Sequence, residues 1–136
     1  MSRFTWQARV YWEDTDAGGV VYYANYLRFL ERARSEWLRA RGVSQRVYAA
    51  DPGIVFAVVA LEVQYRRPAR LDDLLIISAE PLAEGGARFA FRQHIWRERC
   101  DEDLLASASV RIACLDASTM KPRRLPQVIV EGISGP

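Results

Sequence analysis

Two carboxylates stand beside two glycines near the start of the chain, in the segment Asp14-Thr15-Asp16-Ala17-Gly18-Gly19. Glycines let a backbone approach a ligand closely. The spacing of apolar residues predicts that a helix begins soon after, and the first N–H groups of a helix lie unpaired at the positive end of its dipole. Such N–H groups polarise a carbonyl or bind an oxyanion. A carboxylate beside them is the minimum equipment for hydrolysing an activated acyl group.

The same pattern has a purely structural interpretation. Aspartate and threonine are common helix N-caps, so Asp14, Thr15 or Asp16 can act as a cap and nothing more. The spacing by itself leaves both interpretations open.

Other nucleophilic arrangements are poorly supported by the sequence. A cysteine hydrolase needs a histidine partner, and the one histidine, His94, lies in a strand-like segment and is typical of a sheet surface or interface. Cys100 lies in a charged turn and Cys114 on a strand. The sequence contains no Gly-x-Ser-x-Gly elbow and no His/Cys/Glu cluster at metal-ligand spacing, so no metal and no cofactor are expected.

A thioester suits so sparse a set of groups. Its leaving group is a thiol with a pKa of about 8.5, so the departing sulfur needs little protonation. One carboxylate and one oxyanion site are then sufficient equipment. The carboxylate acts either as a base on water or as the nucleophile, and the sequence leaves both roles of Asp16 open.

The elements that must position these groups follow from periodicity. Residues 4–12 alternate between apolar and polar, which predicts a half-buried strand. Residues 22–41 carry apolar side chains at steps of three and four, which predicts one long helix that ends at Gly42. Residues 44–50 predict a short helical turn.

The rest of the chain predicts strands. They cover residues 54–67, 71–82, 87–99 and 104–116, and a last short strand is expected at 127–130. A second long helix, which a ferredoxin-like sandwich would need, is not predicted. An antiparallel sheet buries one long helix by curling around it. We therefore expect an α+β hotdog fold, with one long central helix wrapped by about five strands, as a single domain over residues 1–136.

Composition narrows the function classes. The 136 residues include 19 Lys and Arg and 17 Asp and Glu, a net charge of +2, and acidic residues are interleaved with basic ones. Nucleic-acid binding would need clustered positive charge, so no nucleic-acid partner is expected. The sequence predicts no signal peptide and no transmembrane segment, so we expect a cytoplasmic protein with reduced cysteines.

Three blocks of the sequence resemble the 4-hydroxybenzoyl-CoA thioesterase family, and most closely its Tol–Pal-associated acyl-CoA thioesterase (YbgC-like) subgroup. The blocks are RVYWEDTDAGGVVY at 9–22, YRRPARLDD at 65–73 and MKPRRLP at 120–126. Between the first two, Tyr26 and residues 31–34 and 38–39 continue the match. The resemblance spans essentially the whole chain.

This resemblance implies a hotdog fold, homodimers usually paired into tetramers, and hydrolysis of acyl-CoA to a free acid and CoA. It implies that Asp16 is the catalytic aspartate, that the carbonyl-polarising amide lies at the helix start, around Tyr22, and that Asp14 caps or braces the loop. Substrate contacts are expected at Gly19, Val20, Val21 and Tyr23. The subgroup often has histidine where this chain has Tyr23, a departure that bears on substrate range and rate more than on reaction type.

Coenzyme A carries phosphates, which arginines bind well. Two arginine clusters near proline-marked strand ends are candidates to bind them: Arg66, Arg67 and Arg70, and Arg123 and Arg124. The alternative is that these are ordinary solvated charges. A second hypothesis for the whole chain is a non-catalytic scaffold for acyl thioesters or acyl carrier protein at the cell-envelope machinery. The sequence also leaves open whether CoA or acyl carrier protein carries the acyl group.

Overall fold

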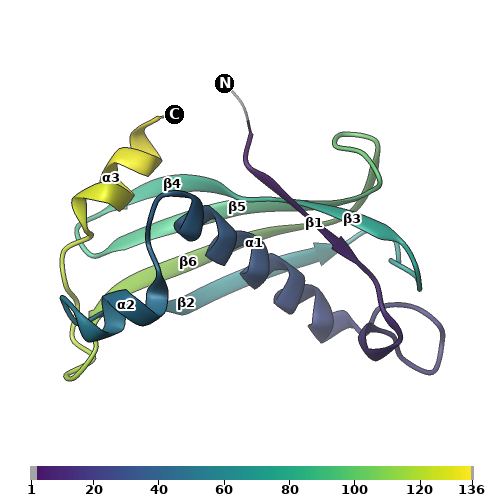
Figure 1. The fold of residues 1–136 in the computed structure, drawn as a ribbon. Helices are drawn as coiled ribbons and strands as arrows, with labels where there is room; N and C mark the ends of the chain where they lie inside the picture. Colours follow the sequence, from purple (N-terminus) through teal and green to yellow (C-terminus); the bar gives the residue numbers. More distant parts are fainter. Residues whose placement is uncertain (1–2, 136) are drawn as a thin grey trace.

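One long helix lies against a curved antiparallel sheet in the computed structural model, which describes residues 3–135 (Figure 1). The strands are β1 (Thr5–Arg9), β2 (Ile54–Tyr65), β3 (Leu74–Ser78), β4 (Glu80–Gly85), β5 (Arg88–Arg97) and β6 (Asp103–Asp116). The helices are α1 (Tyr26–Ala40), α2 (Gln45–Ala50) and α3 (Gln127–Ser134), and short 3-10 turns cover Trp12–Asp14 and Tyr23–Asn25.

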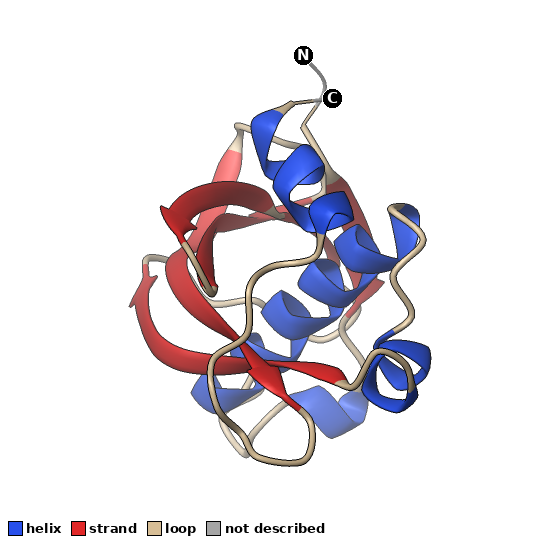
Figure 2. Cartoon of the chain, turned by 90° about the vertical axis from the view of Figure 1, so that its left-hand side faces the viewer, coloured by secondary structure: helices blue, strands red, loops and turns tan. Residues whose placement is uncertain are grey.

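The sheet has six strands, against the expected five or so, because one predicted strand is split in two. Its order is β1-β3-β5-β6-β2, with β4 also paired to β5, and every pairing is antiparallel. The sheet curls around α1 (Figure 2). The expected hotdog arrangement is therefore confirmed. Among the described residues, no helix is both long and apolar enough to cross a membrane.

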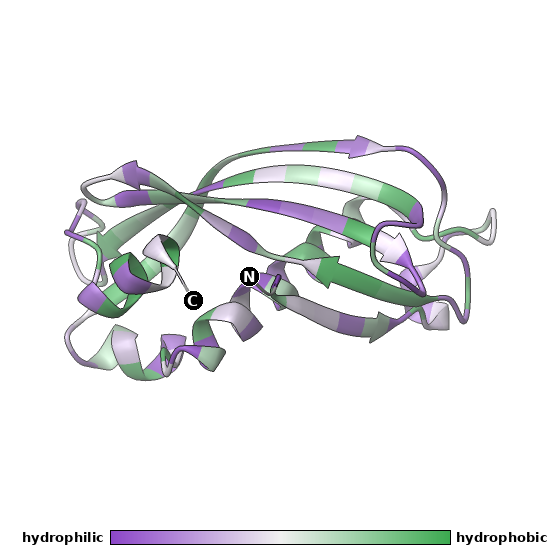
Figure 3. Cartoon of the chain, turned by 90° about the horizontal axis from the view of Figure 1, so that it is seen from above, coloured by the Kyte–Doolittle hydropathy of each residue, from purple (hydrophilic) through white to green (hydrophobic). Residues whose placement is uncertain are grey.

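The core lies between α1 and the inner face of the sheet. The helix buries one stripe spaced by three and four residues, as an amphipathic helix does. The stripe consists of Tyr26, Phe29, Leu30, Ala33, Trp37 and Leu38. The inner face of β5 adds Phe89, Phe91 and Ile95. Coloured by hydropathy, the strands carry much of the apolar sequence, while hydrophilic residues gather at several turns (Figure 3).

Strand β2 is an edge strand, and a bulge keeps its apolar side chains on one face. The register with β6 shifts between Val58 and Ala60. Without this shift, alternation would turn Leu61 outward, because side chains on a strand point to opposite faces in turn. With it, the side chains opposite the core residues of β6 are all apolar. They are Phe56, Val58, Leu61, Val63 and Tyr65, and we call them the β2 apolar stripe.

The strand predicted at 71–82 is interrupted at Ala79. Ser78 causes the break, because its hydroxyl oxygen accepts the backbone N–H of His94 at 2.9 Å, a bond that the strand ladder would otherwise make. The backbone carbonyl of Ser78 accepts the side-chain amide of Gln93 instead, at 3.1 Å. Two short strands, β3 and β4, therefore follow different parts of the long β5.

The short strand predicted at 127–130 is wrong, since these residues begin helix α3. Ile129 is fully buried and Ile133, four residues on, packs against the same core, which is helical spacing. Gly132 permits this packing, because a Cβ there would lie 2.5 Å from Arg41 Nε. The β-branched residues of this segment hide a helix that tertiary contacts stabilise.

The long helix begins later than predicted. Residues 23–25 form a 3-10 turn, and α1 runs from Tyr26 to Ala40. Its end at Gly42 is confirmed, with a left-handed φ of +81° that favours glycine. The short helix predicted at 44–50 is also confirmed, as α2.

Candidate active site

The segment that carries the two carboxylates folds into a small closed loop. The backbone N–H of Asp16 donates to the Val20 carbonyl at 2.9 Å, and the N–H of Tyr22 donates to the Asp14 carbonyl at 3.0 Å. A further bond of 2.8 Å, from the Val21 N–H to the Ala69 carbonyl, ties the loop to the segment before β3. Asp16 therefore begins the tight turn of this loop, and residues 17–19 form its tip.

Asp14 is buried and braces the loop against the helix start. One carboxylate oxygen, Oδ2, accepts the backbone N–H of Tyr11 at 2.8 Å. The other, Oδ1, accepts the side-chain amide of Asn25 at 2.8 Å. Asp14 thus has the bracing role that the family resemblance implied.

Asp16 is exposed and does not cap the helix. Its Oδ1 accepts the backbone N–H of Gly18 at 2.8 Å, and no other partner of its carboxylate is found among residues 3–135. The hydroxyl of Thr15 donates to the Trp12 carbonyl at 2.8 Å. Since none of these three side chains accepts a backbone N–H at the start of the helix that follows, the interpretation of this segment as the cap of that helix is wrong. Asp14 instead caps the 3-10 turn at Trp12–Asp14.

The helix start offers two free backbone donors beside this loop. The N–H of Tyr22, which was expected to polarise the substrate carbonyl, already donates to Asp14, and the N–H of Asn25 donates to the Tyr22 carbonyl at 2.8 Å. The next N–H groups, of Tyr23 and Ala24, open the 3-10 turn and have no acceptor among the described residues. Gly19, at φ +80°, forms the turn that brings the loop back to them.

A tyrosine cluster that the sequence did not predict supports the helix start. The hydroxyl of Tyr65, at the end of β2, donates to the Tyr23 carbonyl at 2.8 Å. The Tyr65 ring meets those of Tyr23 and Tyr26 edge-on, with centroids 6.5 Å and 5.0 Å apart. The Tyr26 hydroxyl accepts the Ala69 N–H at 2.9 Å. Burial raises the pKa of Tyr65 and Tyr26, so both hydroxyls stay protonated at neutral pH.

The first predicted arginine cluster lies near the loop. Arg70 is exposed and forms a β-bridge with Val20, which places it beside the residues expected to contact substrate. Arg67 forms an ion pair with Asp103 at 3.1 Å. The exposed Arg66 makes only a long hydrogen bond, from its Nη2 to Gln64 Oε1 at 3.4 Å. Arg70 and Arg66 are therefore the freer cations of this cluster.

The second predicted cluster lies elsewhere. The Arg123 guanidinium donates to the carbonyls of Pro52 and Gly53 at 2.9 Å and 3.1 Å, next to the start of β2. Arg66 follows the end of β2, and a twelve-residue strand spans roughly 36 Å. Within one protomer, the structure therefore does not bring Arg123 and Arg124 together with the first cluster.

The other potentially reactive side chains are used in packing. His94 is partly buried and stacks on Trp96 with a centroid distance of 5.3 Å, as a residue of the sheet surface would. Cys114 is buried, and burial raises the pKa of its thiol. Within the part of the chain that the structure describes, no group of three or more His, Cys, Asp or Glu side chains could hold a metal ion.

Comparison with known proteins gives a consistent result. The sequence model of the thioesterase superfamily matches residues 18–104. The acyl-CoA thioester hydrolase YbgC of Escherichia coli O6:H1 is 46% identical over 127 residues, covering 93% of this chain and 92% of that protein. A 1,4-dihydroxy-2-naphthoyl-CoA hydrolase of Nostoc punctiforme is 34% identical over 128 residues, covering 94% and 84%.

A solved structure agrees in fold and sequence. The crystal structure of a probable thioesterase from Bartonella henselae superposes with a TM-score of 0.84 at 42% identity, covering 92% of this chain and all of that one. The family-model match, residues 18–104, contains α1 and strands β2 to β5. The chain therefore belongs to the thioesterase superfamily, in the hotdog-fold family that its three sequence blocks resemble.

Proposed function

We propose that the chain is an acyl-CoA thioesterase, which hydrolyses an acyl-CoA to a free acid and CoA at the Asp16 loop. One observation carries the proposal. An exposed carboxylate, held by the Gly18 N–H and not used as a cap, lies in the loop that leads directly into two unpaired helix-start amides. The relatives named as acyl-CoA hydrolases support the same reaction.

The oxyanion site is best assigned to the N–H of Tyr23, with Ala24 beside it. Tyr22 was the first candidate from the sequence, and its amide role remains a prediction. Because the Tyr22 N–H is already bonded to Asp14, the next amide is the more available donor. The carbonyl of Tyr22 accepts Asn25, and that of Tyr23 accepts Tyr65. Hydrogen-bonded peptide groups polarise one another, which strengthens both free donors.

Two routes use this geometry. In one, Asp16 takes a proton from water as the water oxygen attacks the thioester carbonyl. In the other, an Asp16 oxygen attacks that carbon, CoA leaves as a thiolate, and water hydrolyses the resulting anhydride. Single turnover in ¹⁸O-water, with enzyme in excess, distinguishes the base route from an anhydride that water opens at the Asp16 carbon. The base route places one ¹⁸O in the free acid, whereas the anhydride route gives an unlabelled acid and leaves the label in the Asp16 carboxylate.

The β2 apolar stripe supports an apolar acyl group. It begins at Tyr65, which contacts Tyr23. Farther along the stripe, the Leu61 and Val58 side chains are 47% and 44% exposed. Exposed contiguous apolar surface beside a polar site is typical of a ligand groove or an interface. We propose that the acyl chain lies along this stripe, with Gly19, Val20 and Val21 around the thioester.

Further parts of the proposal concern the nucleotide and the assembly. We propose that Arg66, Arg67 and Arg70 bind the CoA phosphates, since Arg70 adjoins Val20.

The long edge of β2 is open in the protomer, and open edges are normally paired, so we propose a homodimer through β2 and a dimer of dimers. We propose that this pair is antiparallel, so that the start of one β2 lies beside the end of the other and Arg123 and Arg124 of the second copy lie toward Arg66 and Arg70. A cytoplasmic role beside the Tol–Pal machinery is proposed from the family resemblance.

A panel of acyl-CoA and acyl-carrier-protein thioesters tests the function. Thiol release is measured for acyl groups of increasing length, together with aromatic ones. Hydrolysis of at least one thioester with a kcat/KM above about 10⁴ M⁻¹s⁻¹ is expected for an enzyme acting on its own substrate class. Tight binding of these thioesters without thiol release would favour the alternative, a non-catalytic scaffold.

A further inference from the structure

A guanidinium without a carboxylate partner lies under the middle of helix α1. Arg34 is partly buried, and its Nη1 donates to Gln93 Oε1 at 3.0 Å. Among residues 3–135, no carboxylate lies within the 4.0 Å of an ion pair with it. The nearest helical acid, Glu31, accepts the Ser35 hydroxyl instead. The other four N–H groups of the Arg34 fork have no acceptor in the described structure.

The side-chain oxygen of Gln93 points toward Arg34 and accepts its hydrogen bond. The residue is fully buried, and its side-chain N–H₂ group donates to the carbonyls of Leu30 and Ser78 at 3.0 Å and 3.1 Å. Both N–H bonds are thereby used, and Oε1 must face Arg34. The guanidinium is thus held in place by a fixed acceptor rather than left to swing into solvent.

A partly buried cation in this position costs free energy, which a bound anion would offset. Burial lowers the pKa of Arg34, and the nearby charge of Glu31 opposes that shift to a smaller extent. Removing a cation from water costs free energy that one neutral acceptor does not fully offset. A planar guanidinium with unused N–H groups matches the two oxygens of a carboxylate.

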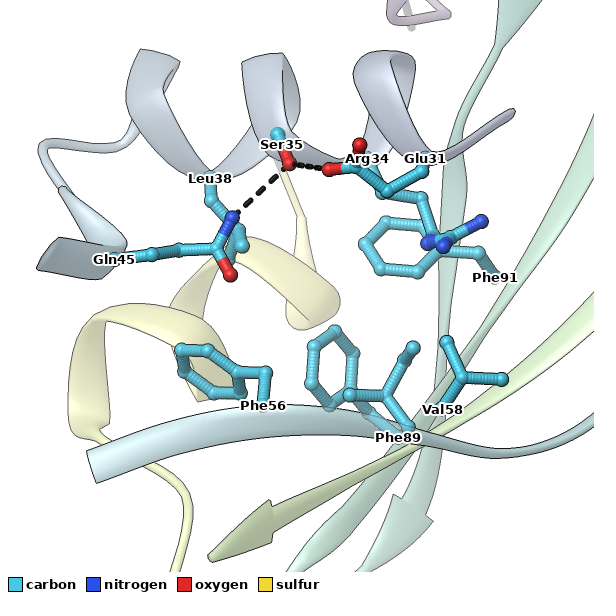
Figure 4. A pocket seen from close by; sticks show the side chains of 10 residues that line it. Glu31, Arg34, Ser35, Leu38, Gln45, Phe56, Val58, Phe89 and Phe91 are labelled. Atoms are coloured by element: carbon cyan, nitrogen blue, oxygen red, sulfur yellow. Dashed lines mark hydrogen bonds between the residues drawn. The ribbon is translucent and has the colours of Figure 1, made fainter. Parts of the chain in front are cut away.

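Arg34 lines a small cavity that adjoins the proposed acyl groove. The cavity has a volume of about 100 Å³, and Phe56, Phe89 and Phe91 form much of its wall (Figure 4). Glu31 and Ser35 also line it, and the Glu31 carboxylate accepts the Ser35 hydroxyl. Val58 also lines it, and Phe56 and Val58 belong to the β2 apolar stripe that starts at Tyr65. Its volume is below the roughly 150 Å³ of a cavity that admits benzene, so it suits the end of a chain rather than a bulky ring system.

We propose that Arg34 binds a carboxylate at the far end of the acyl group, so that ω-carboxyacyl-CoA thioesters are preferred substrates. The inference rests on the proposed thioesterase function. Arg34 lies eleven residues after Tyr23, roughly 16 Å along the helix, and its side chain leans back toward the helix start. Several methylenes therefore separate the reacting carbonyl from the anion, and the apolar stripe accommodates them.

The test compares matched pairs of substrates. We would measure kcat/KM for ω-carboxyacyl-CoAs of four to eight carbons and for the alkanoyl-CoAs of the same carbon number. Wild type is expected to prefer the carboxylate at one or more lengths by roughly 10–100-fold, the range of a hydrogen bond to a charged group. Arg34→Met should abolish this preference while it still hydrolyses alkanoyl-CoA. Arg28→Met, an exposed arginine on the same helix, should keep the preference.

The outcomes separate the inference from the proposed function. If wild type hydrolyses alkanoyl-CoAs but shows no carboxylate preference, or if Arg34→Met retains one, the assignment of Arg34 is wrong and the thioesterase stands. If wild type hydrolyses no thioester, the function itself fails. Circular dichroism and light scattering accompany each variant. A third outcome is that Arg34→Met is a monomer by light scattering and yet keeps the substrate preference of wild type. Arg34 would then pair with a carboxylate of a second copy, and this result would overturn the inference.

Should Arg34→Met fail to fold, Arg34→Lys provides a second test, of the bidentate geometry. Lysine keeps the positive charge but lacks the planar fork, so it is expected to retain part of the preference for the carboxylate. An Arg34→Lys preference equal to that of wild type at every length would also contradict bidentate recognition.

Discussion

Asp14 and Asp16 are separated by one residue, yet their environments give them different roles. Asp14 is buried with both oxygens hydrogen-bonded to protein groups, whereas Asp16 is exposed with one oxygen held by Gly18. A buried carboxylate whose two oxygens both accept hydrogen bonds from the protein is poorly suited to attack a substrate. The pair therefore divides into a brace and a reactive group.

Tyr65 is expected to act through the helix start rather than on the substrate. Tyr65→Phe removes the hydroxyl that donates to the Tyr23 carbonyl and leaves the ring packing intact. A neutral hydrogen bond contributes about 1 kcal/mol, so kcat should fall about fivefold while KM changes little. Steady-state kinetics with one good acyl-CoA measures both values.

Tyr48→Phe is the matched control for Tyr65→Phe, since Tyr48 lies in α2. Unchanged kcat in Tyr65→Phe would remove the tyrosine cluster from the account. A rise in KM at constant kcat would instead show that Tyr65 contacts the substrate.

At this scale the sequence predicts part of the site. The order of Asp16, Gly18 and Gly19 before an apolar helical stripe is enough to select the loop as a candidate site, whereas the choice of Asp16 over Asp14 follows from the family resemblance. Tyr65 is missed, because its contact with Tyr23 joins residues 42 positions apart. The free amide is also displaced by one residue from the expected Tyr22, because the Asp14 carbonyl that occupies the Tyr22 N–H comes near only when the loop folds back.

At the scale of elements, the loop depends on a glycine with a left-handed backbone. Gly19→Ala and Gly42→Ala should destabilise the protein alike, by about 1–2 kcal/mol, because both glycines have φ near +80° and open space at Cβ. Only Gly19→Ala should also lower kcat, since Gly42 ends the helix far from Asp16. Urea unfolding and steady-state kinetics on both variants check this. Equal kcat in the two variants would contradict a catalytic role for the loop geometry.

The turn after β6 should show acid sensitivity. Backbone and hydroxyl donors of Thr119 and Ser118 lower the pKa of Asp116 from 3.8 to about 2. A depressed folded-state pKa means that the carboxylate stabilises the fold above about pH 4, and that this contribution is lost as the pH falls to about 2. Asp116→Asn should therefore unfold more easily than wild type at pH 7, and the difference should disappear by pH 2. A difference that stays constant from pH 7 to pH 2 in urea titrations would refute this.

Most elements were predictable from periodicity, and the exceptions have physical causes. Residues 26–40 and the alternating strands follow simple spacing rules. Helix α3 was predicted as a strand because Val128, Ile129 and Val130 are β-branched, while the packing of Gly132 on Arg41 that favours a helix is a tertiary contact. The break at Ala79 was missed because it depends on the Ser78 hydroxyl meeting β5.

At the scale of the whole molecule, the open edge of β2 is expected to be paired with a second copy. Light scattering of wild type at micromolar concentration should give at least a dimer. Leu61→Lys places a charge on β2 at a side chain that is 47% exposed in the protomer, and it should shift the mass toward monomer. Val130→Lys, on a 39% exposed residue of α3, should not. A monomeric wild type, or equal masses for the two variants, would contradict pairing through β2.

The most direct test of the account is the activity of Asp16→Asn. The substitution keeps the shape of the side chain and an oxygen that can accept the Gly18 N–H, but it removes the base or nucleophile. Thiol release from the best acyl-CoA should fall by about 10²–10⁴-fold, with circular dichroism and oligomer mass unchanged. Glu13→Gln, an exposed carboxylate in the same segment, should stay within about twofold of wild type, as surface changes do. Asp16→Asn activity within about twofold of wild type, in a folded protein, would show that Asp16 is not the catalytic carboxylate.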